Sequence, residues 1–173
     1  TAEAPRLSST TAAVFASVPY KVLPSALEDK IGRMNQELAA ISKEAAGNRC
    51  LVAGDLTMTG EQLAPIGTMD FEELVEIYKE QIGYLVQAGV DLLVVETMMS
   101  LQESRAALIA AKECCDLPVM VTMTFEADGR TLYGTDAKTA ATAQNGGSRL
   151  HQTRHSFCKG FAVHIVYRIS LPV

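Results

Sequence analysis

Short apolar runs alternate along this chain with longer stretches whose apolar residues recur every three or four positions. A continuous apolar run is typical of a strand buried on both faces of a parallel sheet, and an amphipathic stretch between two such runs is typical of a crossover helix. The pattern predicts an α/β fold with right-handed crossovers. In chain order, the expected elements are a helix over 27–46, a strand over 50–54, a helix over 71–88, a strand over 91–95, a helix over 100–115 and a strand over 118–124.

Two architectures fit this alternation: an open doubly wound sheet and a (β/α)8 barrel. Neither a Gly-x-Gly-x-x-Gly segment nor a phosphate-binding P-loop follows any expected strand, which weakens the nucleotide-binding versions of the open sheet. A barrel typically needs roughly 200 residues or more. The chain has 173 residues, with three β/α units and one further candidate strand at 161–167. If it is a barrel, it is an incomplete one.

Polar side chains mark where the expected helices begin. Ser25 with Glu28 and Ser100 with Glu103 have the spacing of a capping box, in which each side chain satisfies a free backbone amide of the other residue. Asp70 is expected to cap the helix over 71–88. These signals place the amino ends of all three helices, so the loops before them are expected to follow the carboxyl ends of the strands.

Composition excludes several classes of partner. The formal net charge is −5, which is not the excess of basic residues that is typical of a nucleic-acid-binding protein. The longest apolar runs are far too short to cross a bilayer, and the first residues lack the pattern of a secretory signal. The four cysteines show no disulfide framework. We therefore expect a cytoplasmic protein that binds neither nucleic acid nor a membrane.

Charge divides the chain unevenly. Residues 1–136 hold all 20 acidic residues and 10 of the 15 basic ones, a balance of 10 − 20 = −10, whereas residues 137–173 hold 5 basic residues and no acid. The three histidines also lie in that last part. This change of composition predicts a body followed by a basic tail.

Ligands of both candidate architectures bind at the carboxyl ends of parallel strands. The polar residues expected there are Asp55, Glu96, Thr122 and Thr124. Glu96 ends an apolar run in which an unpaired carboxylate would be costly to bury. It is interpreted either as a group that holds a substrate ammonium or acts as a base, or as a structural acid that is ion-paired or caps a helix. Asp55 has the same two interpretations, with the structural one favoured because Gly-Asp turns are common.

Two groups of residues have side chains that can bind a metal, but their positions in the sequence give little support for a metal site. Cys114 and Cys115 are expected at the end of a helix, opposite the ligand-binding edge, and Cys50 is expected in the core. His151 and His155 have the spacing of a zinc-binding pair on a helix, with Cys158 nearby, yet no helix signal surrounds them and a fourth ligand is not evident. A structural role is favoured for both groups, and no metal ligand is assigned.

Several segments together resemble homocysteine S-methyltransferase domains, in the version found in bacterial cobalamin-dependent methionine synthases. The resemblance is collinear over about 27–141. It is strongest in the segments 54–67, 71–81, 89–98, 119–125 and 128–136.

The resemblance implies a (β/α)8 TIM barrel that binds homocysteine for methylation to methionine. In the full synthase the methyl group comes from methyltetrahydrofolate through cobalamin, so cobalamin and folate modules are implied partners. The family holds the homocysteine sulfur on a zinc ion bound by three cysteines, which keeps the sulfur a thiolate at neutral pH. Its strand-ending glutamate binds the homocysteine ammonium, and by motif match that role falls on Glu96.

The chain also departs from the family pattern. The Asn-Cys and Gly-Gly-Cys-Cys segments that supply the zinc ligands are absent, and the first family strand with its glycine loop is not recognised. We therefore expect a divergent segment over 1–26, a partial homocysteine-binding barrel over 27–142 and a divergent basic tail over 143–173.

Three hypotheses follow. The resemblance implies a methyltransferase module. The missing cysteines favour a non-catalytic fragment of that barrel, so this chain alone is expected to be inactive, with no residue assigned a catalytic role. An unrelated β/α-barrel lyase with Glu96 as base is the third, although no strand-end lysine suited to a Schiff base is present.

Overall fold

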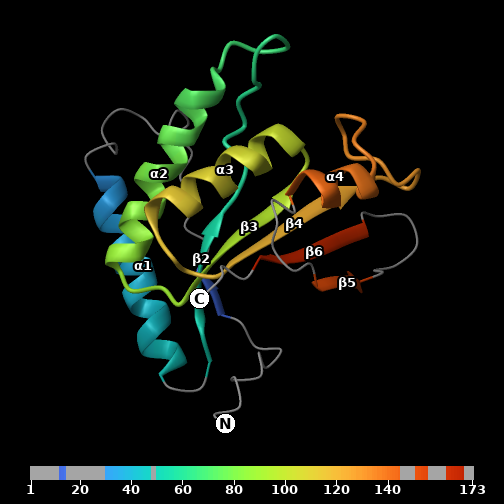
Figure 1. The fold of residues 1–173 in the computed structure, drawn as a ribbon. Helices are drawn as coiled ribbons and strands as arrows, with labels where there is room; N and C mark the ends of the chain where they lie inside the picture. Colours follow the sequence, from blue (N-terminus) through green and yellow to red (C-terminus); the bar gives the residue numbers. More distant parts are fainter. Residues whose placement is uncertain (1–11, 15–29, 48–49, 145–150, 156–162, 170–173) are drawn as a thin grey trace.

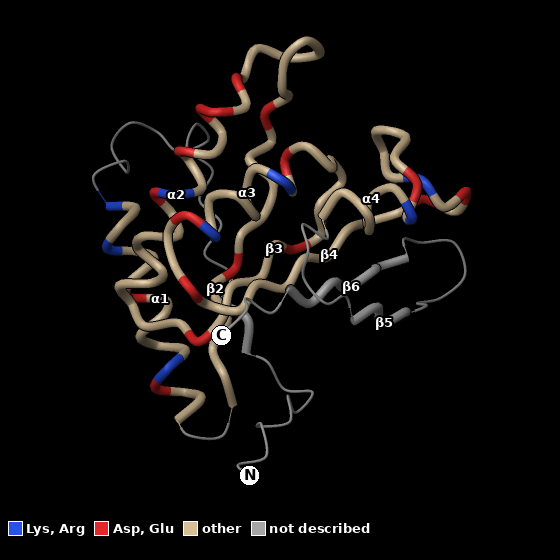
Figure 2. Tube along the Cα trace, viewed as in Figure 1, with Lys and Arg blue, Asp and Glu red and all other residues tan. Residues whose placement is uncertain are grey.

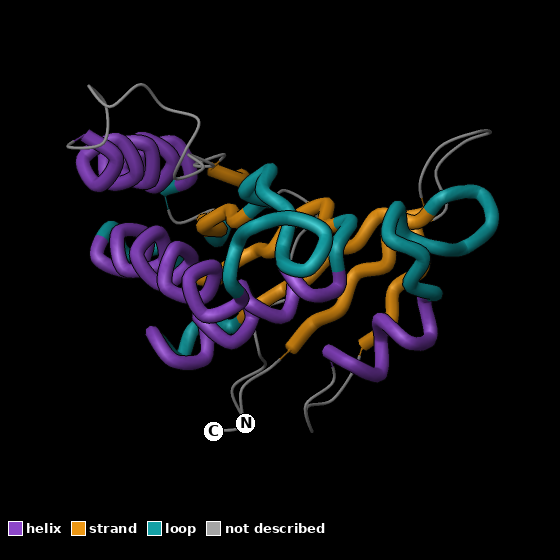
Figure 3. Tube along the Cα trace, turned by 90° about the horizontal axis from the view of Figure 1, so that it is seen from above, coloured by secondary structure: helices purple, strands orange, loops and turns teal. Residues whose placement is uncertain are grey.

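A six-stranded sheet with helices along one side forms the centre of the molecule (Figures 1 and 3). The computed structural model describes residues 12–14, 30–47, 50–144, 151–155 and 163–169. The elements in chain order are β1 (Ala12–Val14), α1 (Ile31–Ala46), β2 (Val52–Leu56), α2 (Phe71–Gln87), β3 (Leu92–Met98), α3 (Leu101–Cys114), β4 (Val119–Phe125), α4 (Ala137–Gln144), β5 (His151–His155) and β6 (Val163–Ile169).

The strand order is β1-β2-β3-β4-β6-β5. The first four strands run parallel, with Ala53 opposite Leu92 and Leu93 opposite Val119. The sequence prediction of a parallel sheet crossed by helices is therefore confirmed for this part of the chain. The sheet reverses direction beyond β4, because β6 pairs antiparallel with β4 and β5 pairs antiparallel with β6.

Several elements differ from expectation, and neither α4 nor β5 was predicted from the sequence. β1 was not expected from the sequence, since its described length is only 3 residues, too short for a periodic signal. The late strand expected at 161–167 is present as β6 over Val163–Ile169, but antiparallel rather than parallel. An antiparallel β5–β6 pair needs no crossover helix, and none lies between these strands among the described residues.

Strands β2 and β3 extend further than the sequence predicts. They end at Leu56 and Met98 rather than near residues 54 and 95. Asp55 and Glu96 therefore lie inside strands, with their backbone in the sheet, and not in the loops that follow. The sheet fixes the direction of both side chains, because successive residues of a strand point to opposite faces.

The core lies between the sheet and the helices. Apolar side chains from one face of β2, β3 and β4 pack with the buried faces of α2 and α3. Tyr78, Leu74, Ile82 and Leu85 on α2 are at most 1% exposed, as expected for the apolar stripe read from the sequence. On the other face, Ala53, Leu92 and Val94 form a second small buried cluster with Met120 against it.

The helix starts are partly as predicted. Asp70 caps α2, its Oδ1 accepting a hydrogen bond from the Glu72 backbone N–H at 2.9 Å. Ser100 caps α3, its Oγ accepting from the Glu103 N–H at 3.3 Å. The described part of α1 begins at Ile31 after Lys30, which makes no side-chain cap, and the expected cap at Ser25 lies outside the described residues.

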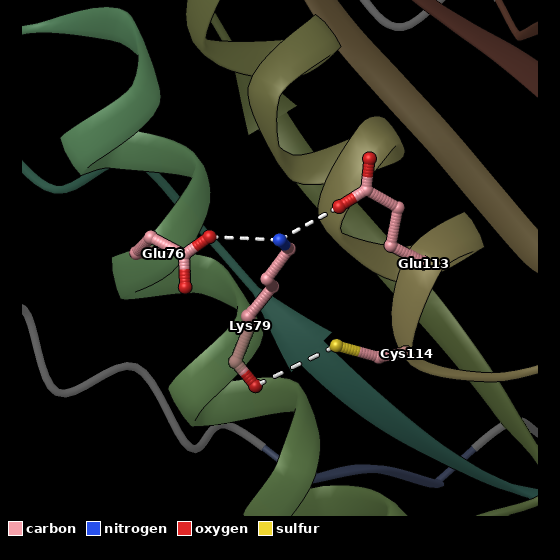
Figure 4. A network of polar contacts seen from close by, with 4 residues as sticks. All are labelled: Glu76, Lys79, Glu113 and Cys114. Carbon is pink, nitrogen blue, oxygen red and sulfur yellow. Dashed lines mark hydrogen bonds and ion pairs between the residues drawn. The ribbon is translucent and has the colours of Figure 1, made fainter.

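Acidic residues are distributed along α2 and α3 and their loops (Figure 2). One cation ties the two helices together at the surface: Lys79 Nζ lies 2.7 Å from a carboxylate oxygen of Glu76 and 2.7 Å from one of Glu113 (Figure 4). The charged outer side of α2 thus includes an ion pair to α3. No helix in the described part of the chain is long and apolar enough to cross a membrane.

Candidate functional site

Four polar residues predicted at the ligand-binding edge share one face of the sheet. Asp55 on β2, Glu96 on β3, and Thr122 and Thr124 on β4 continue the face that carries Ala53, Leu92, Val94 and Met120. Asp55 is in register with Val94, and Val94 with Met120, so the polar residues follow the apolar ones toward the carboxyl ends of the parallel strands. The fold thus brings together residues that lie up to 69 positions apart in the sequence.

Asp55 and Glu96 form a pair of carboxyl groups across β2 and β3. Asp55 is 2% exposed, and its Oδ1 has no hydrogen-bond partner among the described residues. Burial, followed by the charge and hydrogen bond of Glu96, raises the pKa of Asp55 to about 7. Near neutral pH the Asp55 carboxyl group is therefore partly protonated. An ammonium group placed between the two carboxyl groups would favour the ionised form of Asp55.

The backbone of β3 is irregular next to Glu96. Val95 is in register with Val121, but the next registered pair is Met98 with Met123, so β3 has one extra residue at this point. This is a β-bulge. Within it, Thr97 has a φ of 58°, a left-handed conformation that is unusual for a β-branched residue.

Two side chains hold the bulge. The Thr97 backbone N–H donates to Thr122 Oγ1 at 2.7 Å, and Thr57 Oγ1 donates to the Glu96 backbone carbonyl at 3.4 Å. Thr122 is 8% exposed, so its hydroxyl is already engaged inside the protein. Thr124 differs, because its Oγ1 is buried and has no hydrogen-bond partner in the described part of the chain.

Glu103 is a buried carboxylate that the sequence analysis interpreted only as part of a capping box. Its Oε1 accepts from the Thr59 N–H at 2.7 Å, from Thr59 Oγ1 at 2.8 Å and from Tyr78 Oη at 3.2 Å. The reciprocal bond of a capping box does not form, since this carboxylate instead reaches the loop after β2. Burial and the neighbouring Glu103 charge raise the pKa of Tyr78 well above its usual range. The sequence could not show this, because the partners lie 44 and 25 positions away.

A hollow of about 320 Å³ lies between the loops that follow β2 and β4 and the amino end of α3. The loop after β2 is closed by backbone bonds, including Gly67 N–H to the Leu63 carbonyl at 2.9 Å. A Cβ on Gly67 would lie 2.0 Å from the Gln62 carbonyl oxygen, so this turn requires glycine. Asp55, Glu96, Thr122 and Thr124 do not line this hollow. The carboxyl pair is the better candidate site, because it concentrates charge and an orphan polar atom.

The described cysteines lie away from this edge. Cys50 precedes β2 at its amino end, and Cys114 and Cys115 end α3, which returns the chain to the amino edge of the sheet. Cys114 Sγ donates to the Lys79 carbonyl at 3.8 Å (Figure 4), and burial and nearby Cys115 raise the pKa of its thiol. These cysteines do not fit a metal site at the carboxyl edge. No cluster of three or more potential metal ligands exists among the described residues.

The histidines of the tail belong to a strand rather than a helix. His151 and His155 begin and end β5, so the helical spacing that would bring both rings to one metal is not formed. His164 lies on β6, and Cys158 lies outside the described residues, as do the side chains of β5 and β6.

Comparison with known proteins gives two findings. The model of the homocysteine S-methyltransferase family matches residues 9–151. The fold is also similar to the apo crystal structure of the homocysteine methyltransferase MmuM from Escherichia coli, with a TM-score of 0.57 and 20% sequence identity over 75% of this chain. The chain spans 49% of the length of that protein.

Proposed function

This chain belongs to the homocysteine S-methyltransferase family, and we propose that it forms the part of a methyltransferase module that binds the amino-acid end of homocysteine, for methylation to methionine. In the full enzyme, the methyl group would come from methyltetrahydrofolate through cobalamin, supplied by further modules. The finer assignment to a cobalamin-dependent methionine synthase rests on the sequence resemblance over about 27–141.

One observation carries the proposal: Asp55 and Glu96 lie on the same face of neighbouring strands at the carboxyl edge of the parallel sheet, near enough for Glu96 to raise the pKa of Asp55. The repulsion between the two carboxylates and the burial of Asp55 make the doubly ionised form of the pair unfavourable. The ammonium group of an amino acid would offset the repulsion and compensate for the lost hydration. Glu96 is therefore assigned to the ammonium, with Asp55 beside it.

The threonines of β4 complete the proposed pocket. Thr124 has a buried hydroxyl without a partner among the described residues, and it could bind a polar group of the ligand. Thr122 is engaged with the Thr97 N–H, so its role is inside the protein rather than toward the ligand.

The sulfur end of homocysteine would need groups that the described part of this chain lacks. The family's zinc is held by three cysteines, and the described cysteines lie at the opposite edge. The residues present do not fit that metal, so no step through zinc is assigned to this chain. The non-catalytic fragment of the same barrel accordingly remains the second candidate, and family membership weighs against an unrelated lyase.

A chimera tests the proposal. A carboxyl-terminal half from a zinc-binding family member, with its cysteines, would be joined after Ala141, and homocysteine binding would be measured by calorimetry. Truncating one partner of a desolvated charge pair costs roughly 2–5 kcal/mol. We therefore expect Glu96→Gln to weaken homocysteine binding at least tenfold, with the zinc content of the chimera unchanged.

Glu126→Gln is the matched control, because Glu126 follows β4 but is exposed. It removes the same charge near the same edge and should leave homocysteine affinity within twofold of the parent. Equal affinities of the parent and the Glu96→Gln chimera would show that Glu96 is a structural acid, and the assignment of the ammonium site would be wrong.

A further inference from the structure

We propose that Thr122 is a positioning residue for Glu96: its hydroxyl holds the β3 bulge at Thr97, and the bulge aims the Glu96 side chain at Asp55. The inference rests on the proposed function, since it explains how the ammonium-binding carboxylate is oriented. It concerns a residue that would not touch the ligand itself.

The backbone of β3 is strained at Thr97. Thr97 is the only non-glycine residue with a positive φ in the described part of the chain, and its φ is 58°. A β-branched side chain in this conformation is a genuine outlier, which persists only when neighbouring contacts impose it. Among the described residues, backbone strain of this kind is therefore found only at the position that follows Glu96.

A hydrogen bond from β4 imposes this strain. The Thr97 N–H is turned toward β4, where Thr122 Oγ1 accepts it at 2.7 Å, a short hydrogen bond in a buried position. In a regular parallel ladder this N–H would bond to a backbone carbonyl of the neighbouring strand. The Thr122 side chain thus replaces a ladder partner at the point where β3 gains its extra residue.

Glu96 is itself part of the bulge. Glu96 and Thr97 are the two residues of β3 that lie opposite Thr122 of β4, and bulges commonly redirect a side chain beside a functional site. Glu96 is held on its other side by the bond from Thr57 Oγ1 to its carbonyl at 3.4 Å. The peptide between Glu96 and Thr97 is thus held from the loop after β2 and from β4, and the Glu96 carboxyl group lies near enough to Asp55 to raise the pKa of Asp55.

The alternative is that Thr122 only stabilises the sheet. That role predicts a loss of stability without any change at Asp55. The positioning role predicts that losing the hydroxyl moves the Glu96 carboxyl group away from Asp55. The titration of Asp55 separates the two, because Glu96 is the charged group that acts on it, and the α2 side chain near it, Gln81, is neutral.

The experiment uses the full 173-residue chain. The pKa of Asp55 would be followed by NMR of its side-chain carboxyl carbon, in the parent and in Thr122→Val, which has the same shape but no acceptor. We expect the pKa of Asp55 to fall by about one unit or more in the valine variant, as the Glu96 contribution is lost. Thr122→Ser keeps the hydroxyl and should leave that pKa within a few tenths of a unit of the parent.

Thr131→Val is the matched control. Thr131 is 3% exposed, and its Oγ1 accepts the Thr135 backbone N–H at 3.2 Å, so this variant loses the same kind of buried bond away from Glu96. The pKa of Asp55 should not move in it. An unchanged pKa in Thr122→Val, or an equal fall in Thr131→Val, would overturn the proposal.

The serine variant decides the matter if Thr122→Val does not fold. A pKa of Asp55 that falls in folded Thr122→Ser, despite the retained hydroxyl, would also overturn the positioning role. Failure of the proposed function looks different. If Thr122→Val lowers the pKa of Asp55 but homocysteine binding to the chimera does not depend on Glu96, the positioning stands and the ammonium assignment fails.

Discussion

Asp55 differs from the other acids of this chain because it is buried beside a second carboxyl group. Its pKa of about 7 in the folded protein lies well above the ordinary value of 3.8 that it regains on unfolding. Between these two values the folded state binds more protons than the unfolded state, so this group makes the protein less stable as the pH rises from about 4 to about 7. Above that range its contribution stays constant.

We therefore expect Asp55→Asn to raise the free energy of unfolding relative to the parent at pH 8, and to have a much smaller effect at pH 4.5. Urea denaturation at the two pH values measures the difference, and other titrating groups cancel in it. Asp136→Asn is a control of opposite sign, since the Thr139 N–H and hydroxyl lower the pKa of Asp136. That variant should lose stability at pH 8. An equal effect of Asp55→Asn at both pH values would contradict the raised pKa.

At the scale of elements, Glu103 joins three parts of the chain. It lies on α3, accepts from Tyr78 on α2 and binds Thr59 in the loop that follows β2. The single hydroxyl hydrogen of Tyr78 is shared between Glu103 Oε1 and the Thr57 carbonyl, whose oxygen lies 3.0 Å from Tyr78 Oη, so Tyr78 contacts the same loop directly. The position of the carboxyl-edge loops relative to the helices therefore depends on one buried carboxylate.

Glu103→Ala should lower the free energy of unfolding by about 2–4 kcal/mol, because it leaves the Thr59 donors buried without an acceptor. Glu113→Ala on the same helix removes a surface ion pair with Lys79 and should cost about 1 kcal/mol or less. Urea denaturation of both variants tests this. Similar losses in the two would mean that the buried network contributes no more than the surface pair.

For the whole molecule, the distribution of sulfur ligands predicts its metal content. The described cysteines lie at the edge opposite the carboxyl pair, and the cysteine segments of the family are absent from the sequence. We expect the chain, purified without chelator, to hold no stoichiometric zinc by elemental analysis. The chimera with family cysteines serves as the positive control. One tightly bound zinc per chain would contradict the expectation, and His151, His155 and Cys158 would then be the candidate ligands.

The sequence by itself determined the order of the elements from α1 to β4 and the edge at which polar residues gather. Apolar runs and amphipathic stretches predicted β2 to β4 and the helices between them. A strand buried on both faces is apolar throughout, and a helix buried on one face has apolar residues every three or four positions. The same patterns put Asp55, Glu96, Thr122 and Thr124 at the carboxyl ends of the strands. Their roles toward a ligand stay predictions.

Only the tertiary structure decided which of these residues meet. The pairing of Asp55 with Glu96, the bulge at Thr97 and the three bonds to Glu103 join positions 25 to 44 residues apart. Such contacts depend on strand register and on helix packing, which leave no local pattern in the sequence. The antiparallel pairing of β6 with β4 could not be predicted for the same reason, because the residues of an apolar strand do not indicate whether it pairs parallel or antiparallel.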